Sequence, residues 1–274
     1  MAHSERSLLG SRGRTIVYDV YRPDTEAIGV IALVHGLGEH AGRYGHVIAK
    51  LLEAGYVVVA PDHAGHGRSD GTPADVQDFG DFVADLGRVI GAVERAGLPL
   101  YVVGHSMGGA IALSYTLDRP DGIAGLVLSG PAVVPGADLS PVMVALAPVL
   151  GGLVPRLPAT ALPASAVSRD PEVVAAYEAD PQVFHGKIPA GLGGALIAEM
   201  TTFPKRLPGL RVPTLALHGG RDALANPDGT RMIGELGGGG DVTVKIYPEL
   251  FHEIFNEPEQ DEVLDDVLTW LEAH

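Results

Sequence analysis

The chain has 274 residues, of which 46% are apolar and 19% charged, and its formal net charge is −15 at pH 7. This length suits one large buried core, and the negative charge disfavours binding to nucleic acid. The absence of cysteine excludes disulfides, thiolate zinc sites and a cysteine nucleophile. No segment near Met1 is typical of a signal peptide, and no apolar run is long enough to span a bilayer, so we expect a cytoplasmic protein.

Short β-rich runs alternate with stretches of helical periodicity along most of the chain. The runs are rich in Val, Ile, Leu and Tyr, and several are apolar on both faces. They predict strands over residues 15–20, 30–34, 56–60, 100–103, 126–128, 214–217 and 243–247. Helices are predicted over 46–54, 79–96, 107–117 and 259–273. This order predicts an α/β protein with a mostly parallel, doubly wound sheet.

The alternation stops between residues 132 and 207, where proline recurs and no strand pattern is clear. From 132 to 168 only Asp138 and Arg156 are charged. The segment begins at the carboxyl ends of the strands, where α/β proteins bind ligands. We therefore predict a core formed by 1–131 and 208–274 and an inserted helical cap, or lid, over 132–207, with an apolar underside that lines a pocket. A helical insertion that merely packs on the core is the alternative.

The motif Gly-His-Ser-Met-Gly at 104–108 follows one predicted strand and begins a predicted helix. This context is typical of a nucleophile elbow, in which a strained turn presents a serine and leaves no room for bulky neighbours two residues away. Ser106 is the candidate nucleophile, at a helix N-terminus that favours negative charge. A chance match in a glycine-rich chain is the alternative.

A serine nucleophile needs a general base, and with such an elbow the chain order is serine, acid, histidine. His252 is the candidate base because it follows the last predicted strand. Asp222 is the candidate acid because it lies in the turn after the strand at 214–217, and Asp228 is the alternative. His218, at the end of that strand, is predicted to be structural.

The oxyanion of an acyl-transfer intermediate needs two backbone N–H donors. Met107, next to the serine, is one candidate, and Leu37 in the His-Gly-Leu-Gly loop at 35–38 is the other. Asp62, His63 and His66 lie in a glycine-rich segment that is typical of a structured turn. A metal site there is the alternative, but we expect neither a metal nor a cofactor.

Together these motifs resemble the bacterial monoacylglycerol lipases, in the serine-aminopeptidase-like group of α/β-hydrolases. The resemblance runs from Ile16 to Leu271 and rests mainly on segments 35–44, 104–109, 168–181 and 251–257. It implies the α/β-hydrolase fold with an inserted lid, and hydrolysis of a monoacylglycerol, or a similar lipid ester, to glycerol and a fatty acid through an acyl-enzyme on Ser106.

The resemblance also implies that Glu39 and Arg43 lie beside the glycerol and that Tyr177, in the lid, holds a glycerol hydroxyl. A surface ion pair is the alternative for Glu39 and Arg43. Residues 132–162 would line an acyl tunnel, and the lid would touch a membrane surface transiently. The alternatives to this activity are a general carboxylesterase or lysophospholipase with the same triad, and a non-catalytic binding module on a hydrolase fold.

Overall fold

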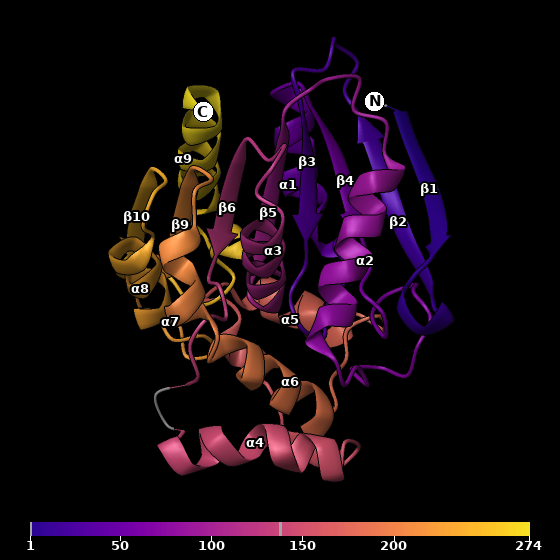
Figure 1. Cartoon of the computed structure of the whole chain (residues 1–274). Coiled ribbons are helices and arrows are strands. Elements are labelled where there is room, and N and C mark those ends of the chain that lie inside the picture. The colour runs from indigo at the N-terminus through magenta and orange to yellow at the C-terminus, as the bar shows by residue number, and fades with distance from the viewer. Residues whose placement is uncertain (1, 137–138) are drawn as a thin grey trace.

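The computed structural model describes residues 2–136 and 139–274, and an eight-stranded sheet forms the centre of this described part (Figure 1). The strand order is β1-β2-β4-β3-β5-β6-β9-β10. Strand β2 pairs antiparallel with β1 and β4, and the other neighbouring strands pair in parallel. The strands are β1 (Ala2–Leu9), β2 (Thr15–Arg22), β3 (Gly29–Val34), β4 (Tyr56–Pro61), β5 (Leu100–His105), β6 (Gly125–Ser129), β9 (Thr214–Gly219) and β10 (Val242–Tyr247).

Helices cover both faces of the sheet, because successive side chains of a strand point to opposite faces and both sets are apolar here. In β3, Val30, Ala32 and Val34 belong to one core cluster, and Ile31 and Leu33 belong to the other. The helices of the first face are α2 (Phe79–Ala92), α3 (Met107–Asp118) and α8 (Asp228–Leu236). Those of the second face are α1 (Gly45–Glu53) and α9 (Gln260–Ala273).

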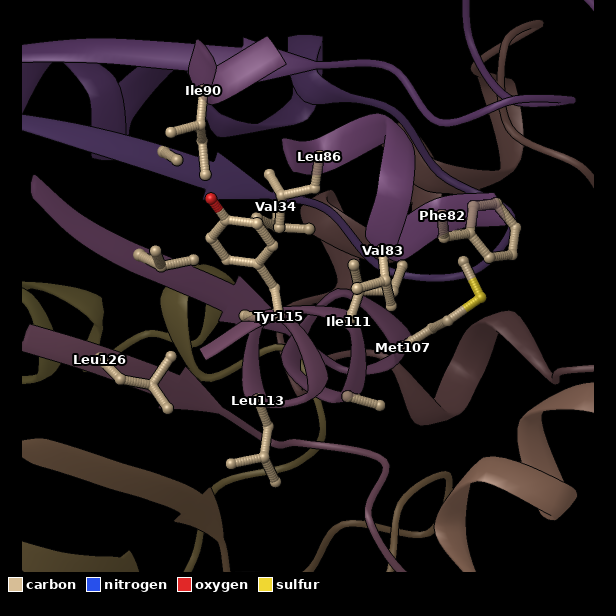
Figure 2. Close-up of a cluster of buried hydrophobic side chains, with 14 of the residues drawn as sticks. Val34, Phe82, Val83, Leu86, Ile90, Met107, Ile111, Leu113, Tyr115 and Leu126 are labelled. Atoms are coloured by element: carbon tan, nitrogen blue, oxygen red, sulfur yellow. The ribbon is translucent and has the colours of Figure 1, made fainter. Parts of the chain in front are cut away.

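Helix α3 is buried along nearly its whole length, from Met107 to Thr116. Figure 2 shows Ile111 of this helix beside Val83 of α2, and Tyr115 beside Val34 of β3, within the first core cluster. Burial of this kind stabilises the position of the helix more than helix propensity does. The N-terminus of α3, which adjoins Ser106, is therefore held firmly against the sheet.

Between β6 and β9 the chain leaves the sheet and crosses its carboxyl end, at the bottom of Figure 1. The predicted cap covers this segment, and its Ala137 and Asp138 lie outside the described residues. Helix α4 packs on α6 as the outermost layer. The elements are α4 (Pro141–Leu153), β7 (Pro158–Thr160), α5 (Pro171–Ala179), β8 (Ile188–Pro189), α6 (Ala190–Met200) and α7 (Phe203–Arg206).

The predicted mostly parallel, doubly wound sheet is confirmed, and the differences from the predicted elements are local. Strand β1 was not predicted, because this edge strand is polar and largely exposed and owes its conformation to pairing with β2. The helix predicted over 79–96 ends at Ala92, because Val93 is extended and its side chain is buried. Helix α8 and the short pair β7–β8 were also not predicted.

We expect Leu113→Ala to lower the free energy of unfolding by about 2–5 kcal/mol, because Leu113 is completely buried in α3 and its loss leaves a cavity. Urea denaturation followed by circular dichroism would measure the change. Val142→Ala on α4 is the control, since Val142 is 66% exposed; it should change the free energy by less than about 0.5 kcal/mol. Equal effects of the two substitutions would contradict the described core.

Candidate active site

Ser106 lies in the turn between β5 and α3 with φ 54° and ψ −121°, a conformation that is strained for any residue with a side chain. The neighbouring backbone approaches so closely that only glycine fits. A Cβ on Gly104 would lie 2.4 Å from the carbonyl oxygen of Gly108, and a Cβ on Gly108 would lie 2.2 Å from that of Val34. The two glycines of the motif are therefore required by contact between backbones.

Side chains from three loops form one hydrogen-bonded chain. His252 Nε2 lies 2.9 Å from Ser106 Oγ, and His252 Nδ1 lies 2.7 Å from Asp222 Oδ2. Asp222 follows β9 and His252 follows β10, so the sheet carries both side chains to the serine. Because the Nδ1–H donates to the carboxylate, Nε2 is left to accept the serine proton, as a general base must.

The carboxyl group of Asp222 is fully buried and surrounded by donors. Its Oδ1 accepts the backbone N–H groups of Leu224 and Ala225 at 2.7 and 2.9 Å. Burial alone would raise its pKa, but the charge of His252 and the hydrogen bonds from His218 and His252 hold the pKa of Asp222 well below its usual range. Asp222 is therefore an anion at neutral pH.

His218, which is predicted to be structural, contacts the candidate acid directly. Its Nε2 lies 3.0 Å from Asp222 Oδ2, and its Nδ1 lies 2.7 Å from Thr230 Oγ1. Both His218 and Thr230 are completely buried. The sequence contained one signal for this contact, because His218 and Asp222 are four residues apart across the turn that ends β9.

The imidazole of His252 is buried, which disfavours its charged form, but the carboxylate of Asp222 acts in the opposite direction. Together with weaker contributions from Glu253 and Glu39, it raises the pKa of His252 above its ordinary value. The surroundings therefore stabilise the imidazolium that forms when the histidine takes a proton from Ser106.

The alternative acid, Asp228, lies on the first turn of α8. Its side chain is 73% exposed and pairs with Arg231 on the same helix at 2.8 Å. The structure therefore brings Asp222 to His252 and leaves Asp228 at the surface.

The two candidate oxyanion donors come from different loops beside the serine. Met107 is the first residue of α3, and the N–H groups at a helix N-terminus have no carbonyl partner within the helix. Leu37 belongs to the loop after β3 and lines the same small cavity as Ser106 and His252. The side chain of Glu39 fixes this loop, because its Oε1 accepts the N–H of Gly36 at 2.7 Å.

Glu39 and Arg43 form the ion pair of the alternative interpretation, but the pair is buried and not at the surface. Arg43 Nη1 lies 2.7 Å from both Glu39 Oε2 and Glu253 Oε1, and Arg43 Nη2 lies 2.8 Å from Glu253 Oε2. Sequence reasoning did not identify Glu253, although it is the residue after His252. Tyr177 of α5 places its ring 4.7 Å from the guanidinium carbon, so the inserted segment also reaches this cluster.

The cavity at Ser106 is small in this conformation. Its volume is about 20 Å³, enough for about one water molecule. The residues that line it come from the core loops and from the inserted segment; they are Gly36, Leu37, Glu39, His105, Ser106, Leu162, Val167, Tyr177, Leu224, His252 and Glu253. In this conformation the cavity is too small for an organic substrate.

Protein groups bind most of the polar side-chain atoms of the segment considered as a metal site, although His66 Nε2 is buried without a hydrogen-bond partner in the described part of the chain. Asp62 accepts hydrogen bonds from the backbone of Ala41 and from Arg68, and the rings of His63 and His66 each contact a backbone carbonyl. Among the described residues, no group of three or more His, Cys, Asp and Glu side chains has a metal-binding arrangement. The geometry supports serine-based acyl transfer.

Comparisons with known proteins agree with this chemistry. A family model described as serine aminopeptidase, S33, matches residues 25–259. The monoacylglycerol lipase of Mycolicibacterium smegmatis is 49% identical over 273 residues, 99% of this chain and 98% of that protein. The monoglyceride lipase of Homo sapiens is 32% identical over 269 residues, 96% of this chain and 89% of that protein. The crystal structure of Paleococcus ferrophilus monoacylglycerol lipase is similar with a TM-score of 0.84 at 34% identity, covering 93% of this chain and 98% of that chain.

We expect Asp222→Asn to lower kcat for a soluble ester by at least about 10³-fold, because the amide cannot hold the His252 tautomer that accepts the serine proton. Asp228→Asn is the matched control and should lower kcat by less than about threefold, since it alters only an exposed pair. Steady-state hydrolysis of a nitrophenyl ester would measure both. The reverse ranking would transfer the role of acid to Asp228.

Proposed function

The chain belongs to the serine aminopeptidase, S33, family, and on that premise we propose that it is a monoacylglycerol lipase, an esterase that releases glycerol and a free fatty acid. The observation that carries the chemistry is the hydrogen-bonded chain from Ser106 through His252 to Asp222. Relatives named for this reaction, similar along nearly the whole chain, support the choice of substrate. No cofactor takes part in the proposed reaction.

The proposed mechanism has two halves. Ser106 Oγ attacks the ester carbonyl while His252 Nε2 takes its proton, and the N–H groups of Leu37 and Met107 hold the oxyanion. The His252 imidazolium then donates that proton to the glycerol oxygen, which leaves. In the second half, water gives a proton to His252 and attacks the acyl-enzyme, and the collapse of the second intermediate frees the fatty acid and returns the proton to Ser106.

The proposed position of the substrate follows from the walls of the cavity. The glycerol lies on the side of Glu39 and Tyr177, because polar groups line that side near the histidine that must protonate the leaving oxygen. The acyl chain extends on the side of Leu162, which is apolar and belongs to the inserted segment. In this proposal residues 132–162 continue the apolar wall as an acyl tunnel.

Substrate entry requires the cap, 132–207, to act as a lid, since sites for organic ligands usually have volumes of about 300–1,000 Å³. The part of the lid near α5 is fastened to the core. Val167 accepts the backbone N–H of Glu253 at 2.8 Å, and Ser168 Oγ donates to the carbonyl of Asn256 at 2.9 Å. Helix α4 packs mainly on α6, which is also part of the lid. Helix α6 is itself held by the core, since its Leu192 is completely buried in the first core cluster, so we place the opening movement in α4.

Helix α4 and the turn after it expose an unusual amount of apolar surface. Within the described residues, no helix combines the length and hydropathy needed to cross a membrane. A contiguous exposed apolar patch is typical of a protein or membrane contact, and with a net charge of −15 the protein gains nothing from anionic lipid. We propose that α4 touches the lipid surface from which the substrate is drawn. The side chains concerned, each at least 42% exposed, are Val142, Met143, Leu146, Val149, Leu150, Leu153, Val154 and Leu157.

We expect Ser106→Ala to lower kcat for monoacylglycerol hydrolysis by about 10⁴–10⁶-fold, because no other group in the site can form the acyl-enzyme. The variant should also fail to react with a fluorophosphonate probe. Its thermal unfolding should match that of the wild type, which separates loss of chemistry from loss of fold. Near-normal turnover by folded Ser106→Ala would exclude Ser106 as the nucleophile.

We expect Leu146→Glu to weaken binding to neutral phosphatidylcholine vesicles by about tenfold, because it places a charge in the apolar face of α4. Hydrolysis of a small soluble ester should not change. Ile28→Glu is the matched control, since Ile28 is 53% exposed and directly precedes β3, at the amino end of the sheet. Vesicle binding that ignores Leu146→Glu and disappears with added salt would mean that the attachment is electrostatic.

A further inference from the structure

The guanidinium of Arg43 is already bound to protein carboxylates. One of its terminal nitrogens contacts Glu39 and Glu253, and the other contacts Glu253 again. The side chains of all three residues are at most 9% exposed. Arginine is the side chain best suited to bind a phosphate or carboxylate ligand through two hydrogen bonds. In Arg43 these hydrogen bonds are already made to carboxylates of the protein.

The charges around this cluster do not cancel. Two carboxylates and one guanidinium leave an excess of one negative charge at the end of the cavity lined by Glu39 and Glu253. Burial, with the nearby charge of His252, lowers the pKa of His105 to about 4, so His105 is neutral at pH 7.

Other titratable groups near the cluster add no positive charge before the reaction, and burial lowers the pKa of His35 and of His66. Burial, with the neighbouring carboxylates, raises the pKa of Tyr177 to about 12 and that of Tyr44 well above its usual range, so both phenols stay neutral. Asp222 faces His252 and carries a second negative charge, which balances the imidazolium when it forms.

We propose that Glu253 makes the site select against an anionic alcohol group, so that the enzyme accepts neutral glyceryl esters and rejects those that carry a phosphate. This inference rests on the proposed esterase function and adds a specificity-determining residue to it. Glu253 acts in two ways. Its carboxylate binds the guanidinium of Arg43, which is then not free to bind a phosphate. The same carboxylate supplies the excess negative charge that repels a phosphate.

The burial of the cluster makes this repulsion effective. Charges inside a protein are screened much less by salt than charges at the surface, and a phosphate monoester brings between one and two negative charges at neutral pH. The fatty acid product is also an anion, so the same excess charge favours its release. A neutral glycerol hydroxyl can donate a hydrogen bond to a carboxylate of the cluster or accept one from the guanidinium, and it is not repelled by the excess charge.

The test compares two substrates with the same acyl chain, monooleoylglycerol and oleoylglycerol phosphate, in micelles of one neutral detergent. Wild-type enzyme should favour the first in kcat/KM, and Glu253→Gln should reduce that preference by about tenfold, the effect of one buried unit charge at a separation of several ångströms. Glu249→Gln is the matched control. It removes one charge from an exposed glutamate that pairs with Arg221, and it should leave the preference unchanged.

The pH dependence of kcat/KM provides a second measurement, which would not change if Glu253 were only structural. The negative charge of Glu253 helps to raise the pKa of His252, and His252 accepts a proton only in its neutral form. Glu253→Gln should therefore lower that pKa and shift the acidic limb of kcat/KM to lower pH. Glu249→Gln should not shift it. An unchanged preference together with an unchanged limb in a folded Glu253→Gln variant would overturn the proposal.

A measurement on the wild type keeps the proposal testable if Glu253→Gln does not fold. Glycerol and glycerol phosphate are compared as inhibitors of the hydrolysis of a small soluble ester at high salt. The proposal is supported if glycerol inhibits and glycerol phosphate does not. It is overturned if glycerol phosphate inhibits as strongly as glycerol, or more strongly. If soluble esters are hydrolysed but monooleoylglycerol is not, the proposed function fails while the charge selectivity is still decided by the two inhibitors.

Discussion

The strained backbone of Ser106 is the constraint on which the rest of the site depends. A residue holds such a conformation only when its surroundings determine it. Here β5 pairs with a parallel strand on each side, and the helix that follows is buried almost throughout. The glycines at 104 and 108 allow backbones to approach within distances that a Cβ would not permit. The core therefore fixes the serine, and the loops bring their side chains to it.

Charge is distributed around the serine in two separate groups. On one side the carboxylate of Asp222 accepts hydrogen bonds from four donors, one of which is His252, and these donors stabilise its negative charge. On the other side Arg43 lies between two carboxylates. A buried ion that lacks a partner is costly, whereas one with several hydrogen bonds is tolerated. Both groups are stable because each charge inside them is matched by donors or by a counter-ion.

The inserted segment combines two opposed requirements. Its inner side covers Ser106 with Leu162, Val167 and Tyr177 and leaves a cavity of about 20 Å³. Its outer helix, α4, leaves large apolar side chains in contact with solvent, which costs free energy in water, and we propose that a lipid surface covers them. A closed site and an exposed apolar face therefore belong to the same conformation of the inserted segment.

The sequence by itself determined the doubly wound sheet, the glycine-flanked serine and the order of serine, acid and histidine, because each is encoded by neighbouring residues. Only the tertiary structure decided which of Asp222 and Asp228 lies against His252, and that Glu253 binds Arg43 from 210 positions away. It also made β1 a strand by pairing it with β2. Contacts between residues far apart in the chain depend on how the whole core packs, and no local pattern of residues records that packing.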